Sequence, residues 1–150
     1  VPVVLGPDNQ TLGVFQIQSN ASRALVDFAS KKPLYWLEKG SFMKKEYRIS
    51  DESGCFAVCF HKMKSFRKKK IRMFLQNSEL LFSMEGGCFD SKKYDNEVFI
   101  QNCRGQPVAT LLLGQGDTKD QSRVMYLNVL EEHVDKALLL VFSMYASLTL

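Results

Sequence analysis

The 150-residue sequence lacks the residue patterns that mark catalytic and metal-binding proteins. It has only two histidines and four cysteines, and no CxxC pair or Cys/His cluster gives the ligand spacing of a zinc site. No serine stands in a nucleophile elbow, and no glycine-rich loop leads into a helix that could cradle a phosphate. We therefore expect no metal, no cofactor and no enzymatic activity.

The sequence also has no apolar run long enough to span a bilayer. The longest, 137–150, has fourteen residues, whereas a membrane-spanning helix needs roughly 20. No linker rich in Gly, Ser or Pro divides the chain, so we expect a single domain over residues 1–150. The spacing of the cysteines does not require disulfides, and we expect buried free thiols in a reducing compartment. The four cysteines are Cys55, Cys59, Cys88 and Cys103.

What the sequence does contain is a series of short segments rich in β-branched and aromatic residues, separated by turn sequences. About ten strands at such regular spacing are typical of an all-β barrel or sandwich. In the segment 55–60 both alternating faces are apolar, so we expect this strand to be covered on both sides. The segments with the clearest pattern are 12–18, 23–28, 47–49, 55–60, 70–75, 79–84, 97–101, 107–113 and 123–129.

Two of the expected hairpins resemble each other. Ile49 stands five residues before Gly54, and Ile100 stands five residues before Gly105, each glycine closing a polar turn between apolar segments. This pattern suggests an internal duplication, although turn chemistry alone also produces it.

The C-terminal stretch has the period of a helix instead of a strand. A helix that is apolar on every side must be surrounded by protein or lipid, and the short length favours protein. Glu131 and Glu132 lie near the expected start, where the helix dipole favours acids. Apolar residues at helical spacing are Val134, Ala137, Leu138, Val141, Phe142, Tyr145 and Leu148. The opposite face is apolar too, with Leu139, Leu140, Met144 and Ala146.

The order of these elements, short antiparallel strands and then one wholly apolar helix, resembles that of the Tubby C-terminal-like superfamily. Within it, the resemblance is to the phospholipid scramblase and LURP-one branch. The resemblance is carried by residues 47–54, 97–109 and 134–140. It implies a closed antiparallel β-barrel of about 10–12 strands around a central C-terminal hydrophobic helix, which would fill the lumen. A helix packed against a sandwich and a membrane-inserted tail are the alternatives.

Scramblase relatives carry an acidic calcium-binding segment before the final helix, and this chain departs from that pattern. The corresponding residues 117–123 contain Asp117 and Asp120 together with Lys119 and Arg123. Calcium takes about 6–8 oxygen ligands, which this mixed-charge segment does not offer. The departure argues against calcium dependence and against lipid scrambling itself.

The strongest functional signal is a cluster of positive charge. Residues 61–72 hold seven Lys or Arg and no acid, with Met63 and Phe66 among them. Anionic headgroups are attracted by about 1 kcal/mol per basic residue near a membrane surface, and apolar neighbours can dip into the interface. The predicted lipid-binding residues are Lys62, Lys64, Arg67, Lys68, Lys69, Lys70 and Arg72. Lys70-Ile71-Arg72 also resembles the Lys-x-Arg pair that binds phosphoinositides in the Tubby branch.

These features lead to a first hypothesis and two alternatives. The first is a non-enzymatic, cytoplasmic domain, peripheral to the membrane, that binds anionic phospholipid, phosphoinositide in particular, through the basic loop. The second is a protein-interaction or transcription-associated module that uses the same residues for nuclear import or nucleic-acid contact, although few aromatics are interleaved for base stacking. The third is a small secreted or virus-encoded interaction domain, which glycosylation at the sequon starting at Asn20 or oxidised cysteine pairs would support.

Overall fold

The computed structural model describes residues 2–19, 22–40, 46–65, 68–87, 97–114 and 124–149. Over these residues the protein is mainly β, with one C-terminal helix. The strands are β1 (Val3–Leu5), β2 (Thr11–Ser19), β3 (Ser22–Asp27), β4 (Pro33–Lys39), β5 (Glu46–Asp51), β6 (Gly54–Ser65), β7 (Lys68–Leu75), β8 (Leu80–Gly87), β9 (Glu97–Gln101), β10 (Pro107–Gly114) and β11 (Val124–Val129), and the helix is α1 (Lys136–Thr149).

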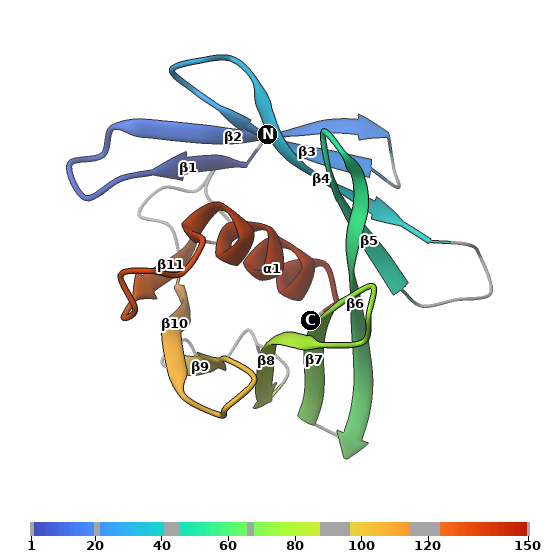
Figure 1. Ribbon diagram of the computed structural model, residues 1–150. Helices are drawn as coiled ribbons and strands as arrows, with labels where there is room; N and C mark the ends of the chain where they lie inside the picture. Colours follow the sequence, from blue (N-terminus) through green and yellow to red (C-terminus); the bar gives the residue numbers. More distant parts are fainter. Residues whose placement is uncertain are drawn as a thin grey trace.

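All eleven strands belong to one sheet, and their order in the sheet is their order in the chain. Every neighbouring pair is antiparallel. The sheet curls around α1, which lies on its concave side (Figure 1). Within the described ranges no ladder joins β1 to β11, so these two strands are the ends of the sheet. The mainly β architecture with a C-terminal helix is therefore confirmed.

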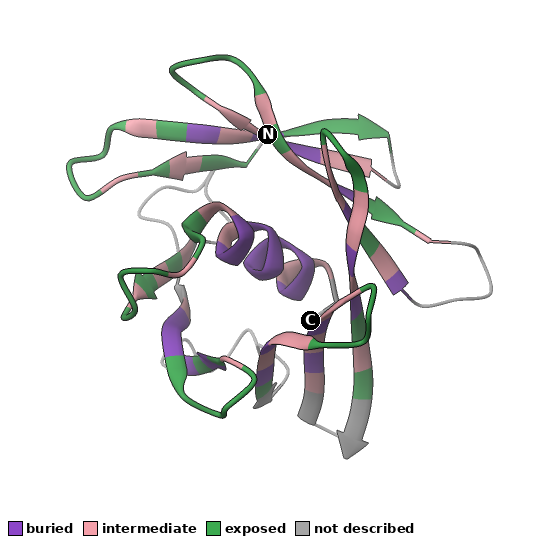
Figure 2. Cartoon of the chain, viewed as in Figure 1, coloured by how far each residue is buried: buried purple, intermediate pink, exposed green. Residues whose placement is uncertain are grey.

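Helix α1 supplies much of the core, as its all-round apolar pattern predicts. Its residues from Leu138 to Ala146 are buried apart from the half-buried Leu140, and Phe142 and Tyr145 have no exposed surface (Figure 2). The polar side chain of Ser143 in this stretch donates a hydrogen bond from Oγ to the Leu139 carbonyl at 2.8 Å. Burial on every side fits a helix enclosed by a sheet better than one lying against a flat surface.

Helix α1 begins after Glu131 and Glu132, as the sequence predicts. Asp135 caps the helix, because its Oδ1 accepts a hydrogen bond from the Leu138 backbone N–H at 3.0 Å. Glu131 and Glu132 precede the cap and are not in the first helical turn. Asp135 therefore supplies the side-chain cap of the helix, which the sequence analysis does not predict.

The two similar hairpins share one turn geometry. Ile49 and Ile100 are both fully buried on the inner face. Two residues after each isoleucine comes an Asp or Asn whose Oδ1 accepts a hydrogen bond from a backbone N–H in the turn. Asp51 accepts from Ser53 at 2.8 Å, and Asn102 accepts from Arg104 at 2.9 Å. Both turns end on a glycine with positive φ, +113° at Gly54 and +76° at Gly105. The matching motif therefore specifies the turn in each hairpin.

Three features of the sheet depart from the expected pattern. The short β1 and the whole of β4 were not among the expected segments. β6 runs to Ser65 instead of ending at Phe60. The prediction that both faces of β6 are covered is wrong: Ala57 and Cys59 on the inner face have no exposed surface, but Phe60 on the outer face is 38 % exposed. The reason is that the sheet has one packed layer, α1, on its concave side only.

Candidate functional site

The predicted basic segment forms the hairpin of β6 and β7, which reaches away from α1 at the lower right of Figure 1. Alternation along the ladder sends successive side chains to opposite faces of the sheet. Cys59 and Ile71 face the core and have no exposed surface. Lys62 and Lys70 are directly opposite each other on the two strands, at positions that alternate with these core residues. Arg72 follows Lys70 on the same face of β7.

We call the outer face that carries Lys62, Lys70 and Arg72 the basic face. Lys62 is exposed, and the other two are half-buried. The neighbouring strand β8 places Glu85 opposite Lys70 and Ser83 opposite Arg72. On the β8 side one carboxylate and one hydroxyl therefore border these cations, and on the β5 side Glu46 lies opposite Phe60.

Two aromatic rings lie among these cations. Phe60 is opposite Arg72 in the ladder, and its ring meets that of Phe74 edge-on at a centroid distance of 6.2 Å. The Arg72 guanidinium carbon lies 5.4 Å from the centroid of the Phe74 ring, within the range of a cation–π contact. This contact places the guanidinium over the Phe74 ring, on the same face as Phe60. The basic face is thus an aromatic and cationic surface, not one of lysines alone.

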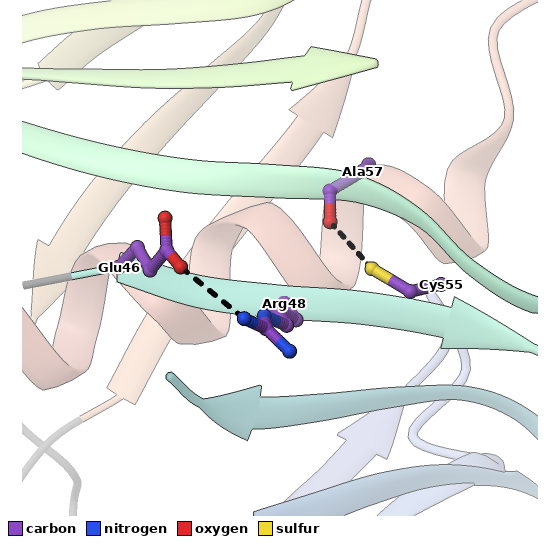
Figure 3. A network of polar contacts seen from close by, with 4 residues as sticks. All are labelled: Glu46, Arg48, Cys55 and Ala57. Carbon is purple, nitrogen blue, oxygen red and sulfur yellow. Dashed lines mark hydrogen bonds and ion pairs between the residues drawn. The ribbon is translucent and has the colours of Figure 1, made fainter. Parts of the chain in front are cut away.

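The β5 side of this surface carries an ion pair. Glu46 and Arg48 lie on the same strand, and a carboxylate oxygen of Glu46 is 3.7 Å from a guanidinium nitrogen of Arg48 (Figure 3). The Glu46 carboxylate is therefore already paired at the edge of the basic face. The other contact drawn there is internal to β6, where the Cys55 thiol points to the Ala57 carbonyl at 3.6 Å.

The inner face of β6 is tied to the central helix beneath the basic face. His61 Nδ1 and the Tyr145 hydroxyl are 3.1 Å apart and form a hydrogen bond. The Tyr145 ring also packs against Tyr47 at a centroid distance of 5.3 Å. Burial raises the pKa of the Tyr145 hydroxyl, so it stays protonated at neutral pH. These contacts fix β6 on α1 and so orient Phe60 and Lys62, the two neighbours of His61, toward solvent.

The structure thus brings together three of the seven predicted lipid-binding residues, which are Lys62, Lys70 and Arg72. Lys64, Lys68 and Lys69 lie in β6 and β7, but the structure describes their backbone only. Arg67 lies outside the described residues, as does Phe66.

Sequence reasoning missed the two aromatic residues of the basic face. The sequence analysis predicts a covered outer face for the strand that contains Phe60 and gives Phe74 no functional role. The alternation of the strands could have identified them. Both phenylalanines occupy positions between core residues, on the same face of their strands as the cations.

A second polar region lies at the start of α1. A cavity of about 470 Å³ is bordered there by Tyr35, Asp51, Glu52 and Asp135. The Tyr35 hydroxyl donates a hydrogen bond to Asp135 Oδ2 at 2.5 Å, and burial together with this carboxylate raises the pKa of Tyr35. Since Asp51 holds its turn and Asp135 caps the helix, these carboxylates have structural roles. Across the described ranges no three His, Cys, Asp or Glu side chains are grouped to hold a metal ion.

The cysteines differ in environment. Cys59 is buried, Cys55 is half-buried and Cys103 is exposed, and all three are free. Burial raises the pKa of the Cys59 thiol, which makes it a poor nucleophile. The expectation of buried thiols is therefore wrong for Cys103, which lies in the turn after β9. Cys88 and the glycosylation sequon at Asn20 lie outside the described residues, as does the segment 117–123 that we compared with calcium sites.

Comparisons with protein-family models, with curated proteins and with solved structures each found no match. In the part of the chain that the structure describes, no helix combines the length and hydrophobicity needed to cross a membrane.

Proposed function

We propose that this protein is a non-enzymatic docking domain that binds anionic phospholipid, phosphoinositide in particular, through the basic face. The observation that supports this most is the placement of Lys62 directly opposite Lys70, with Arg72 on the same outer face. Three cations from two adjacent strands can contact headgroup phosphates together, and the ladder and the helix below hold their backbone in place. We propose a cytoplasmic location at the membrane periphery.

We also propose that the domain is Tubby-like, of the scramblase and LURP-one branch, and that its sheet closes as a barrel between β1 and β11. The one-layer sheet curled around a C-terminal helix supports this assignment. Closure would remove the two open strand edges, which otherwise invite pairing with other chains. In this proposal Lys70 and Arg72 take the place of the Lys-x-Arg pair of the family.

The proposal predicts affinity that depends on charge and salt. Each basic residue near an anionic surface contributes about 1 kcal/mol, so replacing all three by Gln should weaken binding by about 3 kcal/mol, or roughly a hundredfold. Raising salt should weaken wild-type binding as well, since the Debye length falls from about 8 Å at 0.15 M to about 3 Å at 1 M.

Sedimentation with phosphatidylcholine vesicles, with and without phosphatidylserine or a phosphoinositide, tests this prediction. The test variant is the triple substitution Lys62→Gln, Lys70→Gln and Arg72→Gln. A matched control, with the same change in net charge, replaces three exposed lysines on other parts of the surface by Gln. These are Lys32, Lys39 and Lys136.

We expect the control to bind anionic vesicles nearly as well as wild type and the test variant to lose binding. Equal binding by both variants would refute the proposed site. A wild-type protein that binds duplex DNA as tightly as anionic vesicles at the same salt would instead favour unspecific electrostatic attraction.

A further inference from the structure

Phe60 is an apolar side chain exposed in the middle of a cationic surface. Its ring is 38 % exposed, it lies opposite Arg72 across the ladder, and Lys62 follows it on the same face of β6. The inner side of β6 is held by the core, so the ring cannot turn inward without breaking the alternation of the strand. The remaining part of the ring packs against Phe74, at 6.2 Å between centroids.

This exposure sets a requirement on the partner. A single exposed apolar residue is ordinary, but here Lys62 follows Phe60 on β6 and Arg72 lies opposite it on β7. Its partner on the β5 side is Glu46, which is paired with Arg48. An anionic partner that reaches Lys62 and Arg72 therefore also covers Phe60. A soluble polyanion such as an inositol phosphate or a nucleic-acid backbone offers that ring no apolar surface. The boundary between headgroups and acyl chains of a bilayer offers both phosphate and hydrocarbon.

Resting on the proposed function, we infer that Phe60 is an apolar anchor that enters the bilayer interface while Lys62, Lys70 and Arg72 contact the headgroups. The partner is then a membrane surface, not a soluble anion that carries the same phosphate chemistry. Binding then has two components. The electrostatic attraction of the cations is screened by salt, whereas the apolar contact of the Phe60 ring is not weakened by salt. The sequence analysis gives an apolar role to Met63 and Phe66, whose side chains lie outside the described residues, and this inference adds Phe60.

The size of the apolar component follows from the exposed part of the ring. An aromatic side chain buries about 150–250 Å², and the exposed 38 % of Phe60 therefore amounts to about 75 Å². At about 25 cal/mol per Å² this area corresponds to a factor of roughly 20 in affinity when fully covered. We expect a loss of about tenfold for Phe60→Ser, because interfacial burial is partial.

Phe99 provides a matched control. It is a phenylalanine on the outer face of β9 with 51 % of its surface exposed, alternating with the buried Val98 and Ile100. β9 is three strands from β6 in a curled sheet, so Phe99 points in a different direction and cannot contact the same plane as Phe60. Phe99→Ser removes a more exposed phenylalanine ring away from the basic face.

The experiment measures binding of wild type, Phe60→Ser and Phe99→Ser to phosphatidylserine-containing vesicles at about 0.15 M and about 1 M salt, and to inositol hexakisphosphate in solution. We expect the affinity of Phe60→Ser for vesicles to be about tenfold below that of wild type at the lower salt. At the higher salt, the variant should lose the vesicle binding that wild type retains. Its affinity for inositol hexakisphosphate should be unchanged. Phe99→Ser should bind vesicles and inositol hexakisphosphate with the affinities of wild type. Phe60→Trp should keep the vesicle binding that Phe60→Ser loses, because tryptophan favours the membrane interface.

Each contrary outcome points to a separate failure. If Phe60→Ser binds vesicles like wild type while the triple Gln variant does not, the anchor is wrong and the proposed docking function stands. If Phe60→Ser loses affinity equally for vesicles and for inositol hexakisphosphate, Phe60 only supports the cations and the inference is overturned. If wild type binds no anionic vesicle at all, the proposed function itself fails.

Discussion

Replacing Phe142 by alanine tests whether α1 is the central core element of the sheet. The Phe142 side chain has no exposed surface and packs against the ring of Phe82 at a centroid distance of 5.8 Å. Removing a fully buried phenylalanine costs about 3–5 kcal/mol, of which the aromatic pair accounts for about 1 kcal/mol. A domain of this size is stable by about 5–15 kcal/mol, so the variant should lose at least about a fifth of its stability.

Urea unfolding followed by the fluorescence of Trp36, the single tryptophan, measures this loss. We expect a lower midpoint with an unchanged slope, because the surface exposed on unfolding stays the same. Phe99→Ala is the control: its ring is 51 % exposed, so its effect should stay near 0.5 kcal/mol. A loss below about 1 kcal/mol for Phe142→Ala would contradict a core built on this helix.

Three further outcomes follow from the turns, the helix cap and the buried ionisable groups. Gly105→Ala should destabilise the fold by about 1–2 kcal/mol, because the backbone there has a left-handed φ of +76°. No atom lies within 4 Å of the added carbon, so steric contact adds nothing to this cost. An unchanged urea midpoint would be inconsistent with that conformation. Asp135→Ala should cost about 2 kcal/mol, because it removes both the cap of α1 and the acceptor of the Tyr35 hydroxyl. Glu132→Ala, measured in the same way, should have no effect, and equal effects would contradict the structural role of Asp135. Burial raises the pKa of the Cys59 thiol and of the Tyr145 hydroxyl, so both groups stay protonated in the folded state. In the unfolded chain the thiol loses its proton above about pH 8.5 and the hydroxyl above about pH 10. The free energy of unfolding should therefore fall as pH rises through these values, and Cys59→Ala should remove the first part of that fall; a pH profile identical to wild type would refute this assignment.

The sequence was sufficient to predict those parts of the fold that local chemistry determines. Apolar residues on every side of the final segment indicate a buried helix, and they do so without knowledge of what surrounds it. The turns at Gly54 and Gly105 follow from an Asx residue and a glycine at fixed spacing. These signals lie within a few residues of the structure they specify.

The missed features depend on contacts between distant segments. β4 begins at Pro33, a residue that usually marks a turn or an edge, and ends among charges, so its Tyr35-Trp36-Leu37 centre was not recognised. For β6 the sequence shows two apolar faces, but the number of layers packed on the sheet decides whether both are covered. One layer on the concave side leaves Phe60 exposed, and this single fact changes the candidate site from a basic loop to an aromatic and cationic surface.

The most direct test of the central claim is to observe which residues meet the lipid. Amide signals of the labelled wild-type protein, recorded by NMR with and without anionic vesicles that carry a paramagnetic lipid, report contact residue by residue. We expect the strongest broadening in the β6–β7 hairpin around Phe60, Lys62, Lys70 and Arg72, and little change on the outer faces of β2 and β3. Broadening centred on β1 to β3, with the hairpin unaffected, would contradict the proposed docking surface.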